Sequence, residues 1–320
     1  MSINLKIVDP EVELITDDDP VKKIEMAYRI CYQSMDKMCQ GSEALIKKCL
    51  YPDEGARHET PLEHVSINVD VPAIVALAIR QWREIREFKY IAVYSDGDHD
   101  NPDYACFGNL RAFFTFCDEV AFMFSPGAYP IETIAAARAL YEALAVAFPA
   151  IFERKVWNDR ITSMLKIGTE SIHIKIDPYY YTFHVVTTRD VLQEFARHRQ
   201  LSFNVESTRY CNYEKRGFTF VRPRPYDWAE KDTDPRFELW YHTLVTTAEN
   251  YQSMLEQGAK AEEARMLLPG GLKTEFFVSG TELAWEHFCD LRCDRRAHPQ
   301  MRFIAMQIAK ALGIEDSYAE

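Results

Sequence analysis

The segment that most limits what this chain can fold into runs from residue 171 to residue 199. In residues 171–186, "SIHIKIDPYYYTFHVV", β-branched and aromatic residues alternate or follow one another, which predicts one or two strands. A helix is expected to begin immediately afterwards, because Thr187 or Thr188 can cap it and Asp190 stands in its first turn. That helix ends in Arg197-His198-Arg199, so the sequence places a basic cluster where a helix passes into a loop.

The rest of the chain mixes helical and extended patterns without a repeat or a linker. Helices are expected in residues 21–34, 74–88, 131–148, 236–267, 281–293 and 299–312. Residues 272–280 predict a strand, and "QLSFNVEST", directly after the basic cluster, predicts a loop. Because these elements interleave without a regular βαβ period, the sequence predicts an α+β fold with a single domain over residues 1–320.

Residues 72–170 differ from the rest of the chain. They are aromatic, contain an acidic stretch at 95–103, and carry little clustered chemistry apart from Asn109 and Arg111. We interpret them as an inserted, largely helical elaboration within the domain.

Composition restricts the class of partner and the compartment. The chain has 37 Lys and Arg against 49 Asp and Glu, a net charge of -12. Duplex nucleic acid is therefore not an expected partner, because its binding depends on many cations that neutralise phosphates. No signal peptide and no apolar run of about 18 residues, the length of a membrane span, is recognisable. Eight cysteines lack CxxC spacing, which predicts free thiols and, with the other features, a cytoplasmic protein with no membrane partner.

The basic cluster belongs to a dense polar segment, "RHRQLSFNVESTRYCNY", at residues 197–213. Guanidinium groups offer paired donors that match phosphate oxygens. Arg197, Arg199 and Arg209, with Ser202 and Ser207 as neutral donors, can hold one or two phosphates. Surface ion pairs explain a single arginine equally well, but five such donors within thirteen residues favour a small anionic ligand.

Two further clusters leave alternatives open. Arg265 and Arg292 stand among apolar residues, so each is expected to have an anionic partner. That partner is either an anionic ligand or a carboxylate of the chain, Glu262, Glu263 or Glu275. "RHETPLEH", residues 57–64, offers two histidines and two carboxylates for acid/base chemistry, or simply a hydrogen-bonded loop. Cys289 and Cys293 with His287 and His298 fit none of the strong zinc spacings, so no metal is expected.

Taken together, these segments resemble the flavin-dependent thymidylate synthases. The family signature, Arg-His-Arg, two residues, Ser, and then Ser-x-Arg-Tyr, stands here as residues 197–199, Ser202 and residues 207–210. "YRICYQS" (28–34), "HETPLEH" (58–64), "ARMLLP" (264–269) and "WEHFCDLRCDRRAHPQMR" (285–302) are similar to other family segments, in the same order along the chain.

The resemblance implies the fold type and the reaction. It implies reductive methylation of dUMP to dTMP, with methylenetetrahydrofolate as the carbon donor, FAD as the cofactor and NADPH as its reductant. It also implies a homotetramer whose active sites are shared between subunits. The family uses no cysteine nucleophile, and no cysteine lies within the Arg-His-Arg-x-x-Ser core of this sequence.

The resemblance also implies site residues. Arg292 matches the arginine that polarises the uracil ring, which is the catalytic assignment. Residues expected at FAD are Thr60, Arg197, His198, Arg199, Val205, Thr281, Glu282, Leu283 and His287. Residues expected around dUMP are Glu194, Arg197, Val205, Glu206, Ser207, Arg209, Arg265 and Arg292.

Two positions depart from the family pattern. Glu194 stands where Gln is common, and residues 204–207 read Asn-Val-Glu-Ser where many members read Asn-Glu-x-Ser. These departures motivate one alternative, a catalytically inactive relative that still binds nucleotide. The other alternative is a nucleotide or single-strand nucleic-acid binding module that stacks bases on Phe203 and Tyr210.

Overall fold

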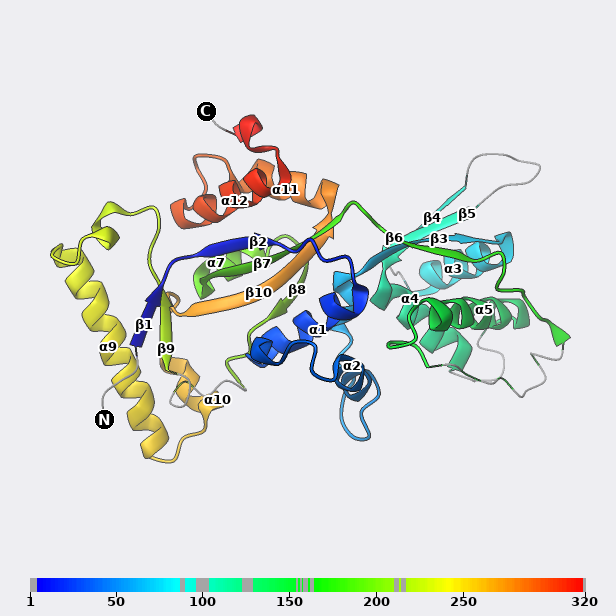
Figure 1. Ribbon diagram of the computed structural model, residues 1–320, viewed down its shortest axis with the longest axis horizontal. Coiled ribbons are helices and arrows are strands. Elements are labelled where there is room, and N and C mark those ends of the chain that lie inside the picture. Colours follow the sequence, from blue (N-terminus) through cyan, green and yellow to red (C-terminus); the bar gives the residue numbers. More distant parts are fainter. Residues whose placement is uncertain are drawn as a thin grey trace. The chain divides into compact units, whose positions relative to one another are not determined.

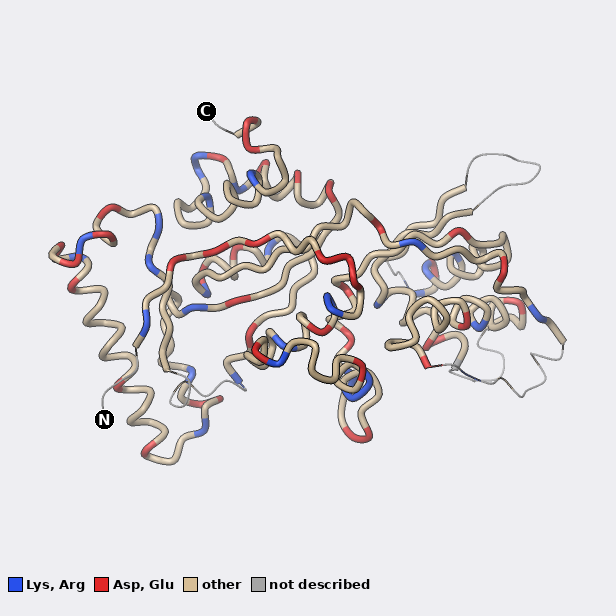
Figure 2. Tube along the Cα trace, viewed as in Figure 1, with Lys and Arg blue, Asp and Glu red and all other residues tan. Residues whose placement is uncertain are grey.

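The computed structural model describes residues 5–86, 90–95, 104–122, 129–153, 155, 157, 161, 164–209, 213 and 217–318 (Figure 1). The chain divides into two compact units. Unit 1 comprises Met1–Asp17, Met26–Met38 and Tyr181–Glu320, and unit 2 comprises Asp18–Glu25 and Cys39–Tyr180. Acidic and basic residues are interspersed along the described parts of both units (Figure 2).

Unit 1 is organised around a sheet of strand order β2-β7-β10-β8. The strands are β2 (Glu11–Leu14), β7 (Tyr180–Thr188), β10 (Lys273–Thr281) and β8 (Ser202–Val205). β2 runs antiparallel to β7, and β8 runs antiparallel to β10 with Val205 opposite Phe276. Strands from both ends of the chain thus meet in one sheet.

Three helices pack on this sheet through one apolar core: α7 (Arg189–Phe195), α11 (Glu282–Arg292) and α12 (Pro299–Leu312). Trp285 and Phe288 of α11 are buried, and Phe288 stacks on Phe195 of α7 with 4.8 Å between ring centroids. The indole N–H of Trp285 donates to the carbonyl of Tyr181, 3.2 Å away, so the buried polar group is satisfied. This packing fixes the ends of α7 and α11 relative to each other.

The remaining parts of unit 1 form smaller cores. β1 (Leu5–Val8) pairs in parallel with β9 (Phe218–Val221), and the long helix α9 (Pro235–Glu256) packs against this pair (Figure 1). The short α10 (Ala261–Ala264) follows. At the end of α1 (Pro20–Cys31), Ile30 and Cys31 pack on Phe277 of β10.

Unit 2 has a sheet of its own, of strand order β4-β5-β3-β6. The strands are β3 (Ser66–Val71), β4 (Ile91–Ser95), β5 (Tyr104–Asn109) and β6 (His173–Ile176), and every pairing is antiparallel. The helices of unit 2 include α2 (Ser42–Leu50), α3 (Ala73–Arg86), α4 (Leu110–Cys117), α5 (Ile131–Ala147) and the 3-10 helix η2 (Thr60–His64).

The α+β class is confirmed, as are the expected helices in the N-terminal, 74–88, 131–148, 281–293 and C-terminal segments. Two local predictions are wrong. Residues 202–205 form a strand because β10 lies beside them, although their sequence resembles a loop. The helix expected to reach residue 267 stops at Glu256, because Gly258 adopts a φ of +92° that a helix cannot continue. The expected elaboration at 72–170 falls within unit 2, where it contributes strands β4 and β5 as well as helices.

Candidate active site

The Arg-His-Arg cluster lies on a pair of tight turns between α7 and β8. Thr188 is the N-cap residue of α7, and the helix ends at Phe195. The backbone N–H of His198 donates to the carbonyl of Phe195 (2.9 Å), and that of Leu201 donates to the carbonyl of His198 (3.0 Å). The turn buries the His198 ring while both flanking arginines are exposed.

Arg292, at the end of α11, is held by three hydrogen bonds to the same region. Its Nε–H donates to Nε2 of His198 at 2.8 Å. Its Nη1 donates to Oε2 of Glu194 at 2.9 Å, and Nη2 donates to the Glu194 carbonyl at 3.2 Å. Glu194 also lies 3.4 Å from Nδ1 of His298 through its other oxygen. The salt bridge of Arg292 is therefore with Glu194, and not with Glu262, Glu263 or Glu275.

The environment keeps His198 neutral. Burial, followed by the charges of Arg292 and His287, lowers the pKa of His198 to about 4. A neutral ring can accept at one nitrogen, and here Nε2 accepts from Arg292, so the proton resides on Nδ1. The ring of Phe288, 4.9 Å away, closes the apolar side of the imidazole. Arg292 is thus held in a fixed orientation, and Glu194 is its one charged partner among the residues that the structure describes.

The exposed groups near this turn fit a phosphate-bearing cofactor. Within the described part of the chain, the guanidiniums of Arg197 and Arg199 make neither an ion pair nor a side-chain hydrogen bond. Such groups match the oxygens of a diphosphate. At the start of α11, Thr281 accepts from the backbone N–H of Ala284 (3.3 Å), and Leu283 is 74% exposed. Exposed cations at the turn and an exposed apolar side chain at the start of α11 are both of kinds that FAD requires, for its diphosphate and for its apolar ring.

Thr60 belongs to unit 2, where it begins η2 and is half-buried. The other residues expected at FAD all belong to unit 1. The placement of Thr60 at the flavin stays a prediction.

The structure brings the expected substrate segment together with Arg265. Val205 directs its side chain to the apolar core, and the Glu206 N–H donates to the carbonyl of Glu275 (2.9 Å). The Ser207 N–H donates to the carbonyl of Cys31 (3.2 Å). Arg265 donates from Nη1 to Oγ1 of Thr208 at 3.3 Å and is exposed, as is Arg209. Tyr210 lies outside the described residues.

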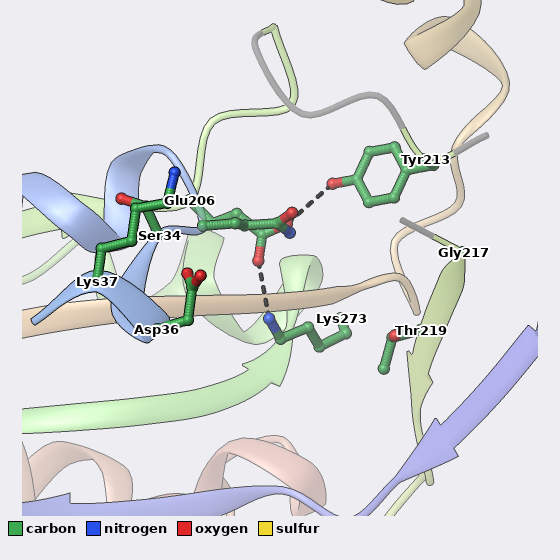
Figure 3. Close-up of a pocket in the computed structure, with 9 residues that line it drawn as sticks. Ser34, Asp36, Lys37, Glu206, Tyr213, Gly217, Thr219 and Lys273 are labelled. Atoms are coloured by element: carbon green, nitrogen blue, oxygen red, sulfur yellow. Dashed lines mark hydrogen bonds and ion pairs between the residues drawn. The ribbon is translucent and has the colours of Figure 1, made fainter. Parts of the chain in front are cut away.

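A polar cavity of about 460 Å³ opens beside this segment (Figure 3). The carboxylate of Glu206 accepts from Lys273 Nζ at 2.9 Å and from the Tyr213 hydroxyl at 3.1 Å, and its side chain is 1% exposed. Lys273 also lies 3.0 Å from Oε1 of Glu275. The cavity is lined by Gln33, Ser34, Asp36, Lys37, Glu206, Tyr213, Gly217, Thr219 and Lys273.

The charges in this cavity stabilise one another. Burial opposes the charged form of Lys273, but Glu206 and Glu275 outweigh it, and the pKa of Lys273 is raised. Burial also acts against the charged form of Glu275, yet His184 and Lys273 lower its pKa to about 2. Lys273 is the residue that sequence reasoning missed. The sequence feature that could have identified it is the two-residue spacing of Lys273 and Glu275, which places both side chains on one face of a strand.

Other site types have no support among the described residues. They contain no group of three or more His, Cys, Asp and Glu side chains arranged to hold a metal ion. Within the same residues, no helix is both long and apolar enough to cross a membrane.

Comparison with known proteins places the chain in a family. A family model described as "Thymidylate synthase complementing protein" matches residues 13–100 and 128–313. A flavin-dependent thymidylate synthase of Geobacter sulfurreducens is 25% identical over 151 residues, which are 47% of this chain and 62% of the relative. The enzyme of the same name from Pyrococcus furiosus is 28% identical over 171 residues, 52% of this chain and 67% of the relative.

A third relative, the flavin-dependent thymidylate synthase of Synechocystis, is 27% identical over 166 residues, 48% of this chain and 75% of that protein. The first relative is thus matched over less than two thirds of its length. The family model, however, covers the Arg-His-Arg turn, the Glu206 segment and Arg292. The chain therefore belongs to the thymidylate synthase complementing protein family, that of the flavin-dependent thymidylate synthases.

Proposed function

We propose that this protein is a flavin-dependent thymidylate synthase that methylates dUMP to dTMP. Methylenetetrahydrofolate would supply the carbon, and FAD, reduced by NADPH, would supply the hydride. The observation that carries the proposal is Arg292, held by Glu194 and by the neutral ring of His198 beside the Arg-His-Arg turn.

Arg292 would act on the uracil ring. A cation fixed against a pyrimidine carbonyl and N3 stabilises the negative charge that develops there as C5 reacts. Its three hydrogen bonds hold the guanidinium in one orientation before substrate arrives, so little reorganisation is needed. The departure at Glu194 is compatible with this role, because its charge is paired with Arg292 and not directed at the nucleotide as a bare carboxylate.

Ser207, Arg209 and Arg265 would bind the nucleotide phosphate. Arg209 and Arg265 are exposed cations, and Arg265 is joined to this segment at Thr208. The Glu206 carboxylate is occupied by Lys273 and Tyr213, so it adds no unpaired negative charge to the site. Val205 and Glu206 would contact the ligands through main-chain atoms, since their side chains are engaged elsewhere.

Arg197, His198, Arg199, Val205, Thr281, Leu283 and His287, with Thr60, would hold FAD. Arg197 and Arg199 would bind its diphosphate, and Leu283 would cover part of its apolar surface. We also propose the homotetramer of shared sites and a cytoplasmic location. The exposure of Leu291, 52% exposed on α11, supports a partner surface on that helix.

The experiment is tritium release from C5-labelled dUMP, with FAD, NADPH and methylenetetrahydrofolate supplied together and then omitted one at a time. The proposal expects release that requires all three. Folded protein that binds FAD and dUMP without release would be an inactive relative. Colourless protein that binds single-stranded nucleic acid would be a binding module, and either result would overturn the proposal.

A further inference from the structure

One helix of unit 2 lies within residues 101–127, the stretch that the family model leaves unmatched. This is α4, capped by Asn109, whose Oδ1 accepts from the backbone N–H of Ala112 at 2.9 Å. Its first backbone N–H, that of Leu110, donates to the carbonyl of Val65 at 2.7 Å. α4 therefore packs beside the segment that contains η2, where the sequence resemblance places a flavin contact.

Arg111 of α4 joins the two ends of η2. Its Nη1 pairs with Oε1 of Glu63, inside the 3-10 helix, and its Nε lies 3.7 Å from Oε2 of Glu59, the N-cap residue. Thr60 lies between these two carboxylates in sequence. A 3-10 helix this short has poor hydrogen-bond geometry and little stability of its own. A cation that bridges its two carboxylates thus restricts both its conformation and its position.

A second ion pair holds the residues just before η2. Arg57 Nη1 lies 2.8 Å from Oδ2 of Asp118, the residue that follows α4, and 3.9 Å from Oε1 of Glu59. The Arg57 guanidinium also stands 5.9 Å from the ring centre of Phe114 in α4. Residues of the stretch 101–127 therefore form ion pairs on both sides of Thr60, with Arg57 before it and with Glu63 after it.

The side chains that form the ion pairs of Arg111 with Glu59 and Glu63 are half-buried. The exposed fractions of the side chains are 38% for Arg111, 21% for Glu59 and 20% for Glu63. Isolated surface pairs contribute little, but partly buried charges that share partners form a network with a defined geometry. Burial, and then the charge of Arg111, also lowers the pKa of His58, which keeps that ring neutral within the network at neutral pH.

We propose that Arg111 is a positioning residue for the flavin site: it fixes η2 on α4 and so sets the place of Thr60. The inference rests on the proposed function, because the flavin contact of Thr60 belongs to that proposal. It assigns a role in cofactor binding to a stretch that the family model does not match.

The test is a titration in which FAD is added to flavin-depleted protein and binding is measured by the quenching of flavin fluorescence. Arg111→Met removes the charge at nearly constant length, and Arg111→Lys restores the charge without the paired donors. The matched control is Arg86→Met, which breaks the 2.8 Å pair of Arg86 with Glu119 in the same unit, a pair that includes no residue of η2. We expect the Kd for FAD to rise about three- to thirtyfold in Arg111→Met, with partial rescue in Arg111→Lys and no change in the control.

The outcomes separate the inference from the proposed function. If the unmodified protein binds no FAD, the proposed function fails and the inference fails with it. If it binds FAD and Arg111→Met has the same Kd, the inference is wrong and the proposed function stands. Should Arg111→Met not fold, Glu59→Gln makes the same test with a side chain of equal size, and an unchanged Kd there overturns the inference as well.

Discussion

Replacing Lys273 with Met should leave the buried carboxylate of Glu206 and the partly buried carboxylate of Glu275 without their shared cation. Lys273 Nζ lies 2.9 Å from Glu206 and 3.0 Å from Glu275, and the exposed fractions of these side chains are 1% and 18%. Removing one partner of a buried ion pair costs about 3–5 kcal/mol of folding free energy. For a chain of this size, roughly 2 °C of Tm corresponds to each kcal/mol, so we expect Tm to fall by about 6–10 °C at pH 8.

The pH dependence gives this prediction its sharpest form. In the unmodified protein the pKa of Glu275 is lowered to about 2, so its contribution to stability is present above the unfolded pKa and is lost as pH falls toward 2. In Lys273→Met the two carboxylates repel, and the pKa of at least one rises above its unfolded value. The stability deficit of the variant relative to the unmodified protein should then shrink as pH falls from 8 to 5.5.

The assay is thermal unfolding at a fixed heating rate at pH 8 and pH 5.5, with Lys37→Met as the control. Lys37 lines the same cavity but is exposed, and surface substitutions of this kind change stability by about 0.5 kcal/mol or less. Equal Tm values for the two variants, or a Tm deficit in Lys273→Met that is the same at both pH values, would refute the reasoning.

Two further predictions concern the Arg292 cluster. Arg292→Ala should reduce turnover of dUMP about 10²–10³-fold, the cost of losing one preorganised electrostatic group, while FAD binding persists; full activity in a tritium-release assay would show that its assigned role is wrong. His198→Asn should reduce the acid sensitivity of folding. The lowered pKa of His198, about 4, means that the unfolded chain takes up a proton between pH 6.5 and 4 that the folded protein excludes. Stability of the unmodified protein should therefore fall across that range, and an identical pH profile of Tm in the variant would count against a neutral buried His198.

Local sequence patterns were sufficient to predict the helices that carry the residues of the candidate site. α11 covers Glu282–Arg292 where a helix was expected over 281–293, and Pro299 opens α12, as its position before an apolar periodic segment predicts. β8 escaped prediction because Ser202–Val205 becomes a strand only through pairing with β10, more than seventy residues later in the chain. Short strands owe their structure to such non-local partners, which propensity does not report.

The pairing of charges in the site was also beyond local reasoning. Arg292 and Glu194 are separated by 98 residues, and Lys273 and Glu206 by 67. With 49 acidic residues available, spacing along the chain does not select a partner. Glu275 illustrates the point, because it was a candidate partner for Arg265 or Arg292 and instead contacts Lys273.

The strand order of unit 1 has a consequence for how the protein matures on the ribosome. β10 lies between β7 and β8, so β7 can pair early with β2, but β8 has no partner in this sheet until residues 273–281 have been synthesised. The nascent chain therefore carries β8 unpaired, together with one open edge of β7, until β10 emerges, and such unpaired strand edges favour aggregation. Completion of this sheet is therefore a late event in folding, and fragments that end before β10 should accumulate as insoluble protein.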